Sequence, residues 1–177
     1  ITQFIGLGDY SAWEEGKKQQ FLIEELTGNR PLLPMNLPAT SEVKEVLDTF
    51  FSISRQSKDA LGAYVISMAT YPSDVLAVVL LQKEVGVKSP MRVVPLFEAL
   101  SDLQGADKTL EALLAIPWYR EHIQGKQEIM LGYSDSAKDA GFLAASWAQY
   151  QAQEKLVAVA KKYDVHLTLF HGRGGSA

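Results

Sequence analysis

The sequence predicts an α/β fold in which about four βα units follow two leading helices. Four short apolar runs are the expected strands, at 63–69 (AYVISMA), 91–97 (MRVVPLF), 127–134 (QEIMLGYS) and 166–171 (HLTLFH). Polar, Gly or Pro residues bound each run, as expected for strands. Their centres lie about 28 to 38 residues apart, which is the spacing of βα units and not of hairpins. The runs are nearly all apolar, which favours parallel strands buried on both faces.

Helical patterns fill the intervals between these runs. They cover 71–86, 101–125 and 138–164, and two further patterns at 12–28 and 40–56 precede the first strand. Pro72 and Ser73 open the first interval and Gly86 closes it, in the order of helix start and stop signals. Pro117 is expected to open a second short helix in the next interval. We therefore expect a helical lead-in at 1–60 and βα units at 61–177.

The composition indicates an ordinary globular chain. Of the 177 residues, 47% are hydrophobic and 21% are charged, and the net charge of -4 predicts no general attraction to nucleic acid or membrane. The longest apolar run, 75–81, is too short to span a bilayer. There is no cysteine, which is compatible with a reducing compartment. The first residues do not resemble a signal peptide, and we expect a chain entered part-way.

Charged side chains follow three successive predicted strands. Glu98 follows the second, Asp135 and Lys138 follow the third, and His171 and Arg173 lie at the end of the fourth. Ligands of parallel α/β folds gather at the carboxyl ends of strands. Two carboxylates brought together there suit Mg²⁺, and the Gly-rich HGRGG string with its guanidinium suits an anion. The residues alone predict a magnesium-assisted site for an anionic substrate, without fixing the reaction.

Each of these residues also has a plainer structural interpretation. Glu98 and Asp135 could cap the helices that follow them. Spacing favours an ion pair for Lys138, with Asp135 or Asp139. HGRGG could be an ordinary glycine turn.

Other rings are expected to be structural. We expect His122 to be a solvated helix residue and His166 a structural or surface residue. Trp118 and Trp147 are expected to pack in the core.

Several long strings resemble the phosphoenolpyruvate carboxylase family. The most specific are MLGYSDSAKDAGFLAASWAQYQAQEKL and LTLFHGRGGS, and AYVISMATYPSDVLAVVLLQKEVG and VVPLFEALSDL match further family segments in the same order. The resemblance covers essentially the whole chain. It implies that residues 1–177 are a single segment of a larger catalytic barrel domain. That segment would be a partial TIM-like α/β barrel of the phosphoenolpyruvate-binding type, with about four βα units and extra N-terminal helices. The family's members are usually cytoplasmic homotetramers.

The resemblance implies a reaction and a set of site residues. The family joins bicarbonate to phosphoenolpyruvate with Mg²⁺ or Mn²⁺, through carboxyphosphate and the enolate of pyruvate, giving oxaloacetate and phosphate. Glu98 and Asp135 would be the metal ligands, and Lys138, His171 and Arg173 the catalytic residues, with Arg173 also meeting substrate. Two apolar residues, Leu96 and Met130, would line a substrate pocket.

Other parts of the family's site are not among residues 1–177. A catalytic histidine and several arginines are among them, so we expect the isolated segment to need the rest of the polypeptide and to be inactive. The alternatives are a non-catalytic metal- or anion-binding fragment and a different metal-dependent barrel enzyme, such as an aldolase or phosphomutase relative. The SDSAKDAG and FHGRGGS strings argue against the latter.

Overall fold

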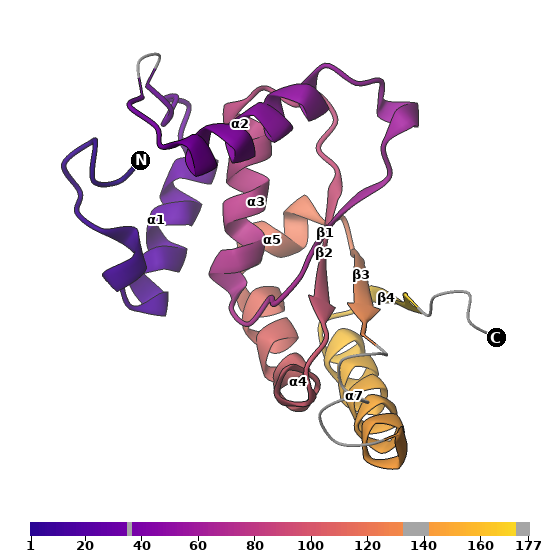
Figure 1. Cartoon of the computed structure of the whole chain (residues 1–177). Helices are drawn as coiled ribbons and strands as arrows, with labels where there is room; N and C mark the ends of the chain where they lie inside the picture. The colour runs from indigo at the N-terminus through magenta and orange to yellow at the C-terminus, as the bar shows by residue number, and fades with distance from the viewer. Residues whose placement is uncertain (35–36, 133–141, 173–177) are drawn as a thin grey trace. The chain divides into compact units, whose positions relative to one another are not determined.

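The structure is a computed structural model that describes residues 1–34, 37–132 and 142–172 (Figure 1). The chain divides into two units. The first contains residues 1–62 and 76–91, and the second contains residues 63–75 together with the chain from Arg92 onward.

The first unit is helical. It contains α1 (Glu15–Thr27), α2 (Ser41–Ser54) and most of α3 (Pro72–Glu84), with 3-10 turns η1 (Tyr10–Ala12) and η2 (Lys58–Ala60). The helices lie where their patterns predicted them, and α3 begins at Pro72. The core residues of this unit are Leu22 and Leu26 from α1, Leu32 from the connector, Phe50 from α2, and Leu76, Val79 and Leu80 from α3.

Two adjacent charged residues at the end of α3, Lys83 and Glu84, form hydrogen bonds with the end of α1 and with the segment at 28–34 that follows it. The Lys83 ammonium donates to carbonyl oxygens at the end of α1, those of Glu25 (2.6 Å), Leu26 (3.0 Å) and Gly28. A cation there satisfies carbonyls that have no partner within the helix. Glu84 Oε2 accepts from the amides of Leu32 at 2.6 Å and Leu33 at 2.9 Å. Both ends of the turn after α1 are therefore tied to one helix.

The second unit is a four-stranded parallel sheet with helices. Its strands are β1 (Ala63–Ile66), β2 (Arg92–Phe97), β3 (Lys126–Leu131) and β4 (His166–His171). The described helices that belong to this unit alone are α4 (Leu100–Ala115), α5 (Pro117–His122) and α7 (Phe142–Lys162). The strands are all parallel and lie in the sheet in chain order, β1-β2-β3-β4. The predicted βα units are confirmed, and so is the second helix that opens at Pro117. A closed barrel is not seen in the described residues.

Two strands end earlier than the sequence predicted. β1 stops at Ile66, shortly before Met68, whose φ of 55° is incompatible with extended backbone. β3 stops at Leu131, directly before Gly132. Among the described residues, none of the helices combines the length and apolar character needed to cross a bilayer.

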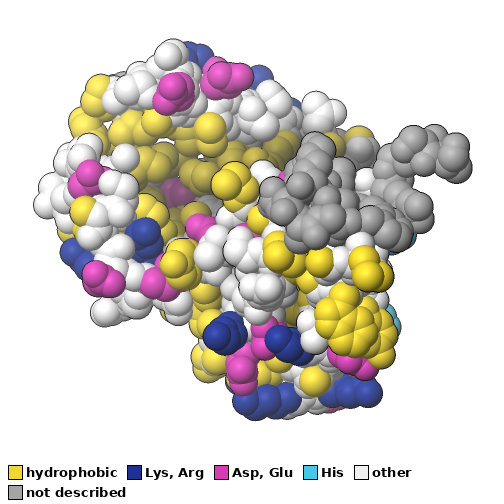
Figure 2. All heavy atoms as spheres, turned by 60° about the horizontal axis from the view of Figure 1, so that its bottom comes forward, with side chains coloured by type: hydrophobic (Ala, Val, Ile, Leu, Met, Phe, Trp, Pro, Cys, Tyr) yellow, Lys and Arg dark blue, Asp and Glu magenta, His cyan; other side chains and the backbone are white. Residues whose placement is uncertain are grey.

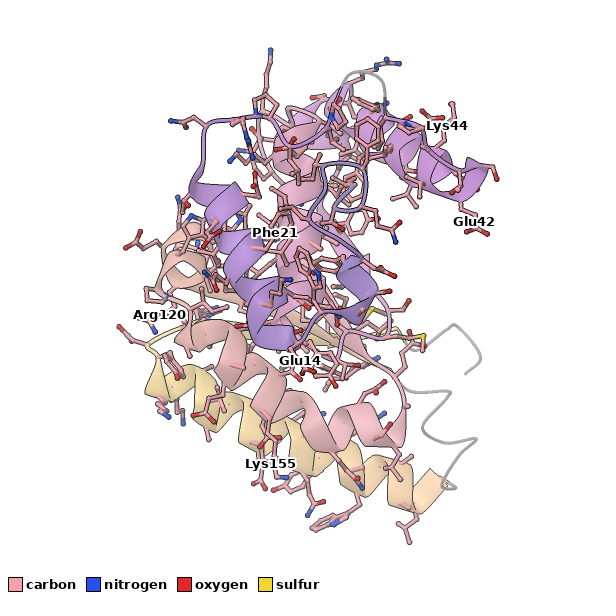
Figure 3. The ribbon with its side chains drawn as sticks, turned by 90° about the vertical axis from the view of Figure 1, so that its left-hand side faces the viewer. Glu14, Phe21, Glu42, Lys44, Arg120 and Lys155 are labelled. Carbon is pink, nitrogen blue, oxygen red and sulfur yellow. The ribbon has the colours of Figure 1, made fainter. Side chains whose placement is uncertain are left out.

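One face of the sheet packs against helices. Val93 and Phe97 of β2, and Ile129 and Leu131 of β3, are buried, and α4 packs against α7. Figure 3 shows these two helices running alongside each other. Tyr119 of α5 is buried and donates its hydroxyl to Gln127 Oε1 at 2.8 Å, which satisfies a polar side chain inside this layer.

Candidate functional site

The carboxyl ends of β2, β3 and β4 lie in one row. The register pairs Phe97 with Leu131 and Leu131 with His171, the last residue of each strand. The next residues are Glu98, Gly132 and Gly172, so the register continued by one residue sets Glu98 beside Gly132, and Gly132 beside Gly172. This row is where ligands of parallel α/β folds are expected.

Gly132 allows the backbone of Glu98 to approach closely. A Cβ atom at position 132 would lie 2.7 Å from the Cα of Glu98 and 3.1 Å from the carbonyl oxygen of Phe97. These neighbours are backbone atoms or directly attached to them, so they cannot swing away as a side-chain end could. The site therefore requires glycine here because of the close packing of β3 on the end of β2.

Two hydrogen bonds hold the end of β3. The Gly132 amide donates to the Phe97 carbonyl oxygen at 2.8 Å, and Gln149 Nε2 of α7 donates to the Gly132 carbonyl oxygen at 2.7 Å. Gln149 is a buried polar residue. Gly132 thus has both of its backbone polar groups bonded, immediately before the segment that carries Asp135.

The side chain that caps the start of α4 is that of Asp102, and not that of Glu98 as the plainer interpretation would have it. The N-cap of this helix is Ala99, and its amide donates to Asp102 Oδ2 at 3.0 Å. Asp102 therefore supplies a carboxylate that bonds the start of α4, and Glu98 lies one residue outside the helix cap.

The predicted apolar residues lie side by side. Leu96 pairs in register with Met130, and Met130 pairs with Phe170. Residues alternate between the faces of a strand, so this row shares a face with Glu98, two residues on from Leu96. Phe170 is partly exposed and extends the apolar row across β4. Their contact with a substrate stays a prediction.

His171 lies on the opposite face from Glu98 by the same alternation. It ends β4 in the row of Phe97 and Leu131, and it lines a pocket together with Leu131 and Gln149. The structure therefore does not bring His171 to the face of Leu96, Met130 and Glu98. Its catalytic role stays a prediction.

Three other predicted site residues, Asp135, Lys138 and Arg173, lie outside the described residues. Glu98 is consequently the one predicted metal ligand with a described position. Within the described ranges no three His, Asp or Glu side chains cluster as a metal site.

Two histidines outside the site differ in environment. His122 was expected to be solvated, and this was wrong: it is half-buried, and its ring stacks on Trp118 with centroids 5.0 Å apart. Burial lowers the pKa of His122 from its usual value. His166 is exposed at the start of β4, as expected, and its amide donates to the Gly125 carbonyl oxygen at 2.8 Å.

Sequence reasoning missed the two residues that hold the site's edge. Gln149 gave no signal, because a glutamine in an Ala-, Gln- and Glu-rich helix is expected on the surface. Gly132 had one available signal, a glycine directly after an apolar strand, which often marks a close backbone approach.

The comparisons with known proteins agree on one family. The family model described as phosphoenolpyruvate carboxylase matches residues 1–177. Proteins of that name from Marinomonas sp. (strain MWYL1) and Hahella chejuensis are 60% and 61% identical over 176 residues, covering 99% of this chain and 20% of each relative. Phosphoenolpyruvate carboxylase 2 of Arabidopsis thaliana is 58% identical over 176 residues, covering 99% of this chain and 18% of the plant protein.

The matched part is thus about a fifth of the length of these relatives. Because the family model spans every residue of the chain, the protein belongs to the phosphoenolpyruvate carboxylase family.

Proposed function

We propose that this chain is a part of the catalytic barrel of an enzyme that carboxylates phosphoenolpyruvate with bicarbonate, giving oxaloacetate and phosphate. The observation that carries the proposal is the row at the carboxyl ends of β2 and β3. Glu98 lies there against Gly132, and the YSDSAKDAG segment begins at the next residue. The four parallel strands in chain order are typical of an α/β barrel, and in the complete protein we expect them to continue into a closed one.

The proposed metal ligands are Glu98 and Asp135, for Mg²⁺ or Mn²⁺. The fit is chemical: both offer carboxylate oxygens, the ligands that hard divalent cations prefer. Asp135 follows Gly132 by three residues, so a fixed Gly132 limits how far this carboxylate can lie from Glu98. When bound, the ion would stabilise negative charge that develops on substrate oxygens.

The proposed reaction has two stages. A bicarbonate oxygen attacks the phosphorus of phosphoenolpyruvate, and the bond from phosphorus to the enol oxygen breaks, which gives carboxyphosphate and the enolate of pyruvate. Carboxyphosphate then releases CO₂ and phosphate, and the enolate carbon forms a bond to CO₂. All of these species are anions except CO₂.

The chain's cationic residues suit such anions. Arg173 would bind a phosphate or carboxylate with paired hydrogen bonds, and Lys138 would supply a second positive charge. His171 would take part in proton transfer or anion binding. The apolar row of Leu96 and Met130 would keep water from the enolate carbon.

The complete protein is proposed to be a cytoplasmic homotetramer that binds phosphoenolpyruvate and bicarbonate. The isolated 177 residues are proposed to be inactive, because the family's catalytic histidine and further arginines lie in other parts of its members. A fragment that binds a metal or an anion without turnover is the alternative. Measuring both binding and turnover distinguishes the two.

The test is oxaloacetate formation by the complete protein, at varied Mg²⁺, for Glu98→Gln and Asp135→Asn. We expect the half-saturating Mg²⁺ concentration to rise by at least about tenfold, since even outer partners of metal ligands have effects of that size. Glu128→Gln is the matched control. Glu128 lies three residues from the end of β3 and pairs with Arg92 Nε at 3.0 Å. Equal Mg²⁺ dependence of Glu98→Gln and this control would sink the metal assignment.

A further inference from the structure

The chain turns sharply at the end of β1. Ser67 and Met68 form a turn directly after Ile66, the last residue of the strand, and Met68 has a φ of 55°. A left-handed φ is unfavourable for a residue with a side chain such as methionine, and it persists only where the surroundings hold it. The side chain of Met68 is 78% exposed, so its own packing does not hold the backbone there.

The other left-handed residues have an ordinary explanation that Met68 lacks. In the described ranges, the residues other than glycine with a positive φ are Met68, Gln124 and Asp164. Gln124 and Asp164 come two residues after the ends of α5 and α7, where a left-handed residue commonly terminates a helix. Met68 instead follows a strand, at the edge of the sheet where ligands are expected. Backbone conformations of this kind cluster at functional sites.

Hydrogen bonds fix the loop that follows this turn. Asp74 Oδ2, in the first turn of α3, accepts from the amides of Thr70 at 3.0 Å and Tyr71 at 2.9 Å. Thr109 Oγ1 of α4 donates to the Thr70 carbonyl oxygen at 2.7 Å. Ala69, which directly precedes this loop, is 1% exposed. The turn is therefore followed by backbone that is anchored on both its amide and its carbonyl side.

The turn leaves Ser67 at one end of the apolar row. The register of β1 and β2, continued by one residue beyond Ile66, sets Ser67 beside Leu96, and Leu96 pairs with Met130. By the alternation of side chains, Ser67 thus lies on the face that Leu96 shares with Glu98. Strands about 4.8 Å apart with a rise of about 3.3 Å per residue put the Cα atoms of Ser67 and Glu98 about 8 Å apart. A small anion can span that distance.

The hydroxyl of Ser67 is a polar group beside apolar ones. Ser67 is exposed, and within residues 1–34, 37–132 and 142–172 its hydroxyl makes no hydrogen bond, so it serves no local turn or cap. Ligand pockets typically combine apolar walls with a few polar groups that orient the ligand. Figure 2 brings forward the side toward which β2 and β3 run in Figure 1, and hydrophobic side chains reach the surface there.

We propose that the Ser67 hydroxyl donates a hydrogen bond to a phosphate or carboxylate oxygen of phosphoenolpyruvate, and that the left-handed turn at Met68 holds this hydroxyl in place. The inference rests on the proposed function. It assigns phosphoenolpyruvate and not bicarbonate, because Ser67 shares its row with Leu96 and Met130, which are proposed to face the enolate carbon. Ser67 is then a substrate-binding residue, and Met68 is a positioning residue that acts through it.

The experiment compares Ser67→Ala with the parent in the complete protein. Binding of phosphoenolpyruvate is measured by calorimetry with Mg²⁺ present and bicarbonate absent, so that no turnover is needed, and oxaloacetate formation is measured separately. Loss of a hydrogen bond to a charged group should raise the Kd and the KM for phosphoenolpyruvate by about 10- to 100-fold. At saturating phosphoenolpyruvate, the KM for bicarbonate and the half-saturating Mg²⁺ concentration should not change.

Two further substitutions are matched controls. Ser67→Thr keeps a hydroxyl at this position and should bind phosphoenolpyruvate nearly as the parent does. Ser89→Ala makes the same chemical change at an exposed serine before the amino end of β2, and it should leave binding unaltered. Equal Kd values for Ser67→Ala and Ser89→Ala would overturn the assignment, and so would an increase confined to the KM for bicarbonate.

Substitutions at Met68 test the turn separately. Glycine accepts a φ of 55° without strain, whereas a β-branched side chain resists it. Met68→Gly should therefore keep the Kd of the parent, and Met68→Val should weaken binding of phosphoenolpyruvate as Ser67→Ala does. Urea denaturation checks that both variants are folded. Equal binding by the two folded variants would overturn the positioning role of Met68.

The two measurements separate this inference from the proposed function. A parent protein that binds phosphoenolpyruvate without forming oxaloacetate would refute the proposed carboxylation, and the Kd values of the Ser67 variants would still decide the role of the hydroxyl. A parent protein that does not bind phosphoenolpyruvate would overturn both.

Discussion

Replacement of Gly132 by alanine tests the energetic importance of the close approach between the ends of β2 and β3. The added Cβ would lie 2.7 Å from the Glu98 Cα, whereas ordinary contacts begin near 3.4 Å, so the two segments must separate by about 0.7 Å. A separation of that size along the bond from the Gly132 amide to the Phe97 oxygen would lengthen it from 2.8 Å to about 3.5 Å, beyond hydrogen-bond range. The substitution therefore either breaks this bond or strains the backbone.

The expected cost is about 2 kcal/mol, within the range for overpacking a tight site and larger than the net value of one hydrogen bond. Amide hydrogen exchange of the peptide containing residues 126–132 measures it locally. At about 1.4 kcal/mol per tenfold, Gly132→Ala should speed this exchange by about 30-fold. Glu98 would also shift, so the half-saturating Mg²⁺ concentration of the complete protein should rise.

Substitutions of two other glycines are controls, with a smaller loss of stability expected at one and a gain of stability at the other. At Gly172 an added Cβ would approach only the mobile end of the Met130 side chain, so Gly172→Ala should cost clearly less than Gly132→Ala. At Gly105, in the middle of α4, an added Cβ meets nothing within 4 Å, so Gly105→Ala should stabilise α4 by about 0.5–1 kcal/mol. Exchange in Gly132→Ala within threefold of the parent would refute the reasoning.

Three further substitutions probe buried polar groups. Gln149→Leu removes the donor to the Gly132 oxygen and should cost about 1–3 kcal/mol, measured as faster exchange at the end of β3; unchanged exchange would contradict it. Tyr119→Phe leaves Gln127 Oε1 without its hydroxyl donor and should cost about 1–3 kcal/mol by urea denaturation, whereas Tyr150→Phe on the surface should cost less. Burial lowers the pKa of His122 from 6.5, so the unfolded chain takes up that proton first and stability falls as the pH drops below about 6.5. His122→Phe should reduce this fall between about pH 7.5 and about pH 5.5 in denaturation midpoints, and an unaltered pH dependence would show that other groups cause it.

The order of elements was predictable because each one has a strong local signal. The apolar runs of β2 and β4 and the Pro signals at Pro72 and Pro117 lie where the structure begins or ends its elements. The end of β1 was not predictable, because no residue propensity indicates the positive φ of Met68.

The sequence was sufficient to predict which candidate residues lie at the ends of strands, but not on which face of the sheet each side chain lies. The position of Glu98 was predictable because the residue directly follows an apolar strand, and Glu98 lies beside Gly132 at the strand ends. Its role as a metal ligand stays a prediction. The separation of His171 from Glu98 depends on register, which a single strand sequence does not specify. The expectation that Trp147 packs in the core was wrong, since this residue is 59% exposed. It was misplaced because a large aromatic ring in a helix is usually buried, and only the packing of α7 reveals which side has a neighbour.

The chain-ordered sheet has a consequence for protein synthesis. Each strand pairs with one made just before it, so the sheet can grow from the ribosome by addition at one edge, with no earlier strand to displace. From the start of β3 to the start of β4 is about 40 residues, which take about 2 to 8 s to translate. During each such interval the newest strand presents unpaired backbone groups at its free edge. Nascent chains paused at that stage are therefore the ones most exposed to misassociation and most dependent on chaperones.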